Sequence, residues 1–102
     1  MEKMSYFWNQ NQKPIFMNKV RRIIKLLGVT IEELRSENRT RRVADARSML
    51  AALLPATQEQ VASFLGCTQP AVHKMRRRHT ILLQNDYVYQ RKWKEVFSVA
   101  RS

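Results

Sequence analysis

Apolar residues recur at the spacing of α-helices along most of the chain, and this periodicity constrains the fold more than any other feature. Only two glycines and three prolines interrupt the 102 residues. Residues 87–89 alternate weakly, as a strand would, but the spacing that follows them favours a helix. The spacing predicts an all-α fold of five or six helices. The apolar stripe of the first predicted helix contains Phe16, Val20, Ile23, Ile24 and Leu27.

Residues that begin and end helices divide this pattern into segments. Gly28 and Gly66 suit the left-handed position that follows a helix. Thr30–Glu33 and Thr57–Gln60 each have the form of a capping box, in which two side chains satisfy free N–H groups at the start of a helix. A charged connection is expected at 36–42. Helices are expected to begin near Pro14, Ile31, Val43, Gln58, Gln69 and Tyr87.

The chain is long enough for one hydrophobic core and one domain. Residues 1–13 mix polar amides with aromatic residues and are predicted to be an N-terminal arm. Residues 14–102 are predicted to be a helical domain. Within it, His79 is expected to be a hydrogen-bonded core histidine, and Trp93 and Phe97 are expected to pack against the first and third helices.

The segment 58–78 is predicted to be a helix-turn-helix. This motif needs a small residue where its two helices cross, and Ala62 meets that requirement. It also needs a residue that tolerates positive φ in the turn, which is Gly66. Val72, six residues later, anchors the second helix, and Cys67 between them is expected to be a small buried residue. The second helix of such a unit enters the major groove of DNA.

Basic residues greatly outnumber acidic ones, with 19 Lys and Arg against 8 Asp and Glu and a formal charge of +11. A surplus of this size predicts an anionic partner, and double-stranded DNA is expected first. Gln69 suits a bidentate bond to adenine, and Lys74 suits phosphate or guanine. The residues expected to contact DNA from the second helix are Thr68, Gln69, Pro70, His73, Lys74, Arg77 and Arg78.

Other function classes lack the residues that they require. One cysteine and two histidines spaced six apart predict no metal site. No glycine-rich phosphate loop can be written, and the acidic residues are scattered, so neither an enzyme nor a bound cofactor or small-molecule substrate is expected. There is no run of 18 apolar residues and no apolar signal-peptide core, so a cytoplasmic location is expected.

The helix-turn-helix resembles that of phage repressors and Cro proteins. The resemblance rests on Gln58-Glu59-x-Val61-Ala62-x-x-x-Gly66-x-x-Gln69-x-x-Val72. In those repressors, glutamines at the positions of Gln58 and Gln69 share a phosphate and an adenine. The resemblance therefore implies that Gln58 joins the DNA-binding residues of the second helix.

Two further segments resemble the C-terminal DNA-binding domain of the bacterial replication initiator DnaA. They are Val29-Thr30-Ile31-Glu32-Glu33-Leu34-Arg35-Ser36 and Arg39-Thr40-Arg41-Arg42-Val43-x-x-Ala46-Arg47. The resemblance covers about residues 16–97 and implies the fold of that domain, which is similar to that of the Trp repressor. It implies that Arg41, or else Arg39, enters the minor groove. It also implies that Arg42 and Arg47 lie near phosphates.

The chain departs from DnaA where that family reads its origin sequence. The signature G-G-R-D-H-[ST]-T-V is replaced by residues 65–72, Leu-Gly-Cys-Thr-Gln-Pro-Ala-Val. The initiator's ATPase domain is not in this chain either. The scaffold is therefore expected to be shared, whereas the origin preference and the initiator function are not.

These observations predict a sequence-specific double-stranded DNA-binding protein that is regulatory or associated with a mobile element. Helix 68–78 would read the major groove, and the Arg39–Arg42 loop would grip the backbone or the minor groove. A basic amphipathic helix over 15–27 offers an alternative, binding to an acidic membrane or protein surface. RNA binding is a second alternative. The target sequence, the regulated process and the oligomeric state are left open.

Overall fold

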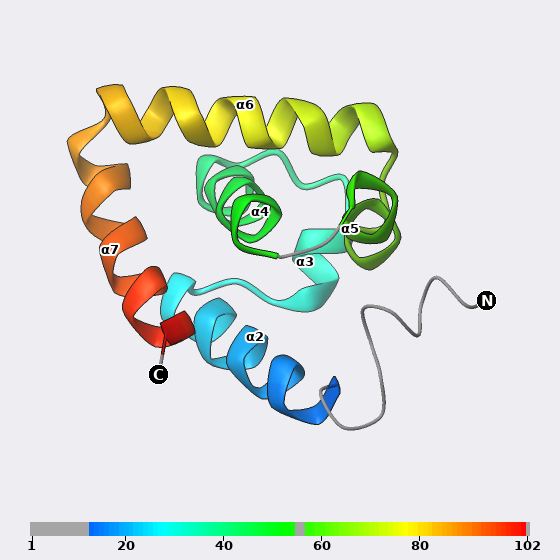
Figure 1. Ribbon diagram of the computed structural model, residues 1–102. Helices are drawn as coiled ribbons and strands as arrows, with labels where there is room; N and C mark the ends of the chain where they lie inside the picture. Colours follow the sequence, from blue (N-terminus) through cyan, green and yellow to red (C-terminus); the bar gives the residue numbers. More distant parts are fainter. Residues whose placement is uncertain (1–12, 55–56, 102) are drawn as a thin grey trace.

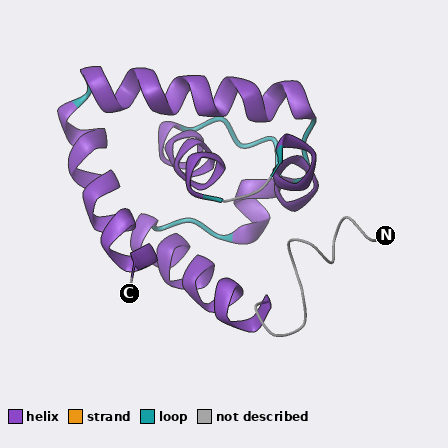
Figure 2. Cartoon of the chain, in the orientation of Figure 1, coloured by secondary structure: helices purple, strands orange, loops and turns teal. Residues whose placement is uncertain are grey.

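The computed structural model describes residues 13–54 and 57–101, which form six helices joined by short turns and loops (Figures 1 and 2). No strand occurs in these ranges, and the predicted all-α fold is confirmed. The predicted N-terminal arm lies outside the described residues, except for Lys13, which begins the first helix. The helices are α2 (Lys13–Leu27), α3 (Ile31–Arg35), α4 (Arg41–Leu53), α5 (Gln58–Leu65), α6 (Gln69–Asn85) and α7 (Tyr87–Arg101).

Helix α4 lies at the centre of the fold, with α6 along one side, α2 along the other and α7 across one edge (Figure 1). Val43, Ala46 and Leu50 recur on α4 at helical spacing and are completely buried. Burying a Val or Leu side chain stabilises a fold by about 1.5–3 kcal/mol. The core therefore holds α2 and α6 on opposite sides of α4.

Side chains cap the helices where the sequence predicts. Thr30 Oγ1 accepts a hydrogen bond from the N–H of Glu33, and Glu33 Oε1 accepts one from the N–H of Thr30, both at 3.0 Å. Thr57 and Gln60 form the second capping box. Asp86 Oδ1 accepts from the N–H at position 89 at 2.9 Å and caps α7. These local bonds fix where three of the helices begin.

The predicted connection 36–42 is two residues too long. Arg41 and Arg42 form the first turn of α4, and the loop is confined to 36–40. Within this loop, Asn38 Oδ1 accepts hydrogen bonds from both the N–H and the hydroxyl of Thr40. The charge of Arg41 and Arg42 suggested a loop. In the structure, Thr40 is the N-cap residue, so α4 begins at Arg41.

The side chain of Arg47 holds this loop against α4. Its guanidinium donates to four main-chain carbonyl oxygens, at distances of 2.6–3.0 Å. Arg47 was expected near a DNA phosphate. The structure instead directs its donors at the protein itself, because the loop curls around the middle of α4. The four carbonyls belong to Glu33, Leu34, Ser36 and Asn38.

His79 joins α6 to α7 in the core. His79 is 8% exposed, and its Nδ1 lies 2.7 Å from the Tyr89 hydroxyl. Its ring packs edge-on against the ring of Trp93, with 4.4 Å between the two ring centroids. The expected core histidine is confirmed, and Trp93 is half-buried beside it. Phe97 was also expected in the core, but 42% of its surface is exposed, because it lies at the rim where α7 passes α2 and the end of α4.

This burial predicts a pH dependence of stability. Desolvation lowers the pKa of His79 below its usual 6.5, so below that pH the unfolded chain takes up a proton more readily than the folded chain. Stability is then full above pH 6.5 and decreases as the pH falls towards 5. The pKa values of the Glu33 and Asp86 carboxyl groups are also lowered in the folded protein. Protonation of these groups therefore also decreases stability as the pH falls, but only below about pH 4.5.

Urea unfolding at pH 7, 6 and 5 measures this effect. His79→Gln is expected to remove most of the decrease between pH 7 and pH 5. His73→Gln is the matched control, since His73 is exposed on α6 and its loss should leave the decrease unchanged. An equal decrease in the His79→Gln protein would show that another group is responsible.

Candidate nucleic-acid interface

Helices α5 and α6 and the turn between them form a two-helix unit. Gly66 has φ +69°, a left-handed conformation that suits glycine, and it ends α5. Thr68 begins α6, where its side chain accepts a hydrogen bond from the N–H at position 71 at 3.3 Å. Ala62 and Val72 are buried at 5% and 0% exposure, so they face the rest of the molecule. Both helices begin where the sequence predicts, and α6 continues beyond the predicted motif to Asn85.

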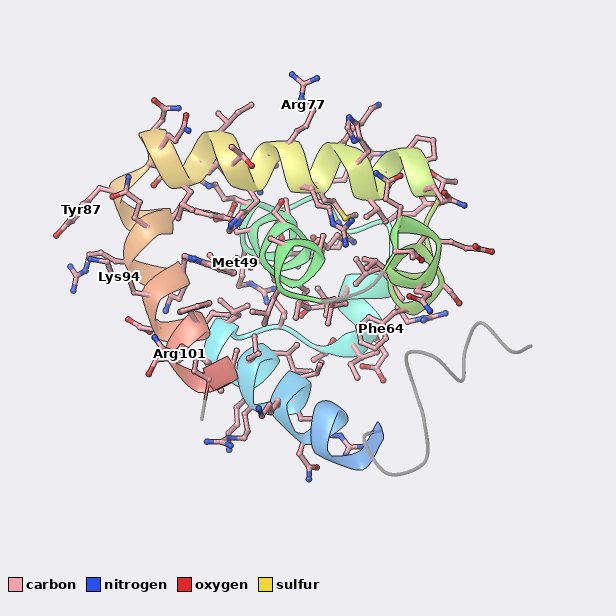
Figure 3. All side chains as sticks on the ribbon, viewed as in Figure 1. Met49, Phe64, Arg77, Tyr87, Lys94 and Arg101 are labelled. Atoms are coloured by element: carbon pink, nitrogen blue, oxygen red, sulfur yellow. The ribbon has the colours of Figure 1, made fainter. Side chains whose placement is uncertain are left out.

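The opposite face of α6 is open to solvent. Figure 3 shows Arg77 pointing away from the body of the protein. The exposed residues on this face are Gln69, Pro70, His73, Lys74 and Arg77, all of them predicted DNA contacts. None of their side chains forms an ion pair or hydrogen bond with another described residue. The polar side chains among them are therefore available to a partner.

The two glutamines expected to act together lie side by side. Gln58 at the start of α5 and Gln69 at the start of α6 line one shallow depression, together with Pro70, His73 and Lys74. The turn at Gly66 brings these two helix starts to one face although eleven positions separate the glutamines. Amide groups placed this way can contact a phosphate and a base edge at the same time.

Two other arginines of α6 are turned inward. Arg78 was predicted to contact DNA, but it is half-buried, with Nη2 2.7 Å from Asp45 and Nη1 3.1 Å from the Ser48 hydroxyl. Arg76 donates to the carbonyl of Ala51 at 2.9 Å. The reason is helical spacing, because positions 76 and 78 flank the side of α6 that packs on α4. Only part of the basic run 74–78 therefore faces solvent.

The predicted Arg39–Arg42 cluster is divided between different partners. Arg39 is exposed, forms no ion pair with any described residue, and lines a groove shared with Thr68. Arg41 pairs with Asp45 and with Asp86, and Arg42 pairs with Glu33 at 2.8 Å. These pairings lower the pKa of Asp86 and of Glu33.

All three arginines nevertheless stay exposed, Arg41 by 59% and Arg42 by 47% of the side chain. Ion pairs as exposed as these contribute little to stability. A phosphate can therefore compete with the carboxylates for Arg41. Arg42 would also have to give up the bond that its Nη1 donates to the carbonyl of Gly28, whereas Arg39 needs no such exchange.

Arg35 has a positioning role that the sequence did not reveal. Its Nη1 donates to the carbonyl of Phe64 at 2.5 Å, and its guanidinium lies beside Gly66. A cation at a helix C-terminus complements the helix dipole and the free carbonyls there. Arg35 thus joins α3 to the end of α5, and no sequence signal links two positions 29 residues apart.

The described residues offer little to other kinds of site. Cys67 is half-buried beside the turn, and burial raises the pKa of its thiol. Among the described residues, no three His, Cys, Asp or Glu side chains come together as metal ligands. In the same part of the chain, no helix has both the length and the apolar character needed to cross a membrane.

No protein-family model, no curated protein and no solved structure matches this chain. The similarity to phage repressors and to DnaA therefore rests on the residues quoted above.

Proposed function

We propose that this protein binds double-stranded DNA in a sequence-specific manner through the N-terminal half of α6. One observation carries the proposal: the exposed face of α6 presents Gln69, His73, Lys74 and Arg77, while Val72 on its inner side is buried. A helix held in this way by one face can enter a major groove with the other.

The chemistry of the exposed side chains suggests how DNA would be read. Gln69 can pair with N6 and N7 of adenine, and Pro70 can contact a thymine methyl group. Lys74 and Arg77 supply cations for phosphate or guanine. Arg39, across a groove from Thr68, would contact the backbone or minor groove next to the bases that α6 reads. We further propose a regulatory or mobile-element role in the cytoplasm.

Binding of an acidic membrane through α2 receives less support. The apolar stripe of a membrane-surface helix must be free to enter the lipid. In α2, Val20 and Ile23 are each 1% exposed and pack in the core, so this stripe is already occupied. RNA binding is tested by competition with structured RNA in the next experiment.

Selection from a random duplex library tests the proposal. The protein should enrich one short sequence, and fluorescence anisotropy should then show that this duplex binds more tightly than a shuffled duplex. An excess of structured RNA should compete no better than shuffled DNA. Enrichment of no sequence, or stronger competition by RNA, would contradict sequence-specific DNA binding.

Gln69→Ala is expected to weaken binding to the selected duplex and to relax preference at one base pair. A bidentate glutamine contact contributes about 1–3 kcal/mol of discrimination against the wrong base. The measurement is anisotropy on four duplexes that differ at that base pair. Gln84→Ala is the matched control, since Gln84 is exposed on the same helix about 22 Å further along its axis. If the Gln69→Ala protein discriminates among the four base pairs as well as the wild-type protein does, Gln69 does not make the assigned base contact.

A further inference from the structure

A second basic surface lies on α2, and the proposed function does not use it. Arg21, Arg22 and Lys25 are all exposed, and none of their side chains forms an ion pair or hydrogen bond with another described residue. Lys19 is not part of this surface, because its Nζ donates to the carbonyl of Ala100 at 3.2 Å. We call Arg21, Arg22 and Lys25 the α2 basic face.

This face points away from α6. Val20, Ile23 and Ile24 form the buried side of α2, and the helical period places positions 21, 22 and 25 on its other side. Helix α4 lies between α2 and α6 (Figure 1). Three stacked helices, each about 10 Å across, separate the two basic surfaces by roughly 30 Å.

One short duplex cannot contact both surfaces without bending sharply around the protein. DNA is stiff over about 150 base pairs, so such a bend over a site of 20 base pairs has a considerable cost in free energy. Cations on the far side of the molecule therefore have no role in binding a single straight site. They are available to a second duplex.

We propose that the α2 basic face binds the phosphate backbone of a second DNA duplex, so that one molecule bridges two DNA segments. The proposal rests on the proposed function for the first duplex. Arginine and lysine side chains with no base-reading residues among them suit sequence-independent backbone contacts. The second duplex is therefore expected to bind irrespective of its sequence.

One observation favours DNA over a lipid surface as the partner of this face, and a second accounts for its attraction to an anion. Between positions 18 and 27 of α2, the exposed side chains (Asn18, Arg21, Arg22 and Lys25) are all polar, so this part of the helix offers no exposed apolar side chain to a lipid surface. The cations also outnumber nearby carboxylates: the depression that Arg21 and Lys25 line includes one acid, Glu32, and the hydroxyl-bearing Thr30. The net positive charge suits a polyanion.

A bead assay tests bridging. The selected duplex is fixed to beads and saturated with protein, and a second, fluorescent duplex of shuffled sequence is added at about 100 mM salt. Capture of the fluorescent duplex is expected with the wild-type protein. R21Q/R22Q/K25Q should reduce this capture at least 10-fold, while its affinity for the selected duplex in solution changes less than 3-fold.

R91Q/K92Q/K94Q is the matched control, because it removes the same charge from α7, and Figure 3 shows Lys94 pointing outward there. It should retain at least half of the capture. Circular dichroism during heating checks that both variants fold. Equal losses in the two variants would mean that net charge, rather than the α2 basic face, causes capture, and would overturn the proposal.

The remaining outcomes separate this inference from the proposed function. If the selected duplex binds but the fluorescent duplex is not captured, the inference fails and the function stands. If no duplex binds, both fail. Capture that persists in R21Q/R22Q/K25Q would indicate bridging through protein dimers and would also overturn the inference. Sedimentation with phosphatidylserine vesicles that depends on these three residues, without bridging, would assign the face to lipid instead.

Discussion

Arg47→Ala is expected to lower the free energy of unfolding by about 3 kcal/mol, the largest stability effect that we predict for a polar residue. Its guanidinium donates to four carbonyl oxygens of α3 and the loop 36–40. Hydrogen bonds to a charged group contribute about 1.5–3 kcal/mol each, but four bonds from one side chain do not add fully. Without Arg47, the partly buried carbonyls keep their desolvation cost and lose their donor.

Urea unfolding followed by circular dichroism measures this effect. Arg77→Ala is the control, because Arg77 points into solvent and its loss should change the free energy of unfolding by less than about 0.5 kcal/mol. Arg47→Lys should recover only a small part of the loss, since one ammonium cannot reach four carbonyls. A loss below about 1 kcal/mol for Arg47→Ala would mean that the loop is held by other contacts.

Affinity for the selected duplex is expected to fall about 500-fold between 50 and 200 mM salt. Each phosphate neutralised on duplex DNA contributes about −0.9 to the slope of log affinity against log salt. The five exposed cations of the interface then give a slope of about −4.5. They are Arg39, Arg41, Arg42, Lys74 and Arg77.

Anisotropy titrations at four salt concentrations give this slope, and they also test the fate of two ion pairs. A slope near −2.7 would show that Arg41 and Arg42 stay paired with their own carboxylates, leaving three cations for DNA. Arg77→Gln should make the slope less steep by about 0.9. The α2 variant R21Q/R22Q/K25Q should leave it unchanged. Affinity that does not depend on salt would contradict backbone binding altogether.

The parts of the fold that depend on neighbouring residues were predictable from the sequence. Thr30 and Thr57 begin helices through side chains three positions along, and Gly66 ends one through its own backbone conformation. The apolar spacing that carries Val43 and Val72 into the core is likewise a local pattern. Such signals lie within one or two helical turns, so the sequence alone contains them.

The orientation of the arginines was not predictable in the same way. Arg35, Arg47 and Arg78 have long side chains that can reach carbonyls or carboxylates on other helices, and the choice depends on how α4 packs. Before the fold is known, each such residue looks like solvent-facing charge. The outward residues of α6 were easier to identify, because Val72 and His79 define the buried side of that helix.

The exposed face of α6 has a consequence for engineering and for evolution. The side chains of Gln69, His73, Lys74 and Arg77 form no hydrogen bond or ion pair with any other described residue, whereas Thr68 and Val72 hold the helix in place. If the proposed function holds, specificity and architecture are encoded by different positions of one helix. Exchanging those four outward side chains should retarget the protein to new sequences while its melting temperature stays nearly constant.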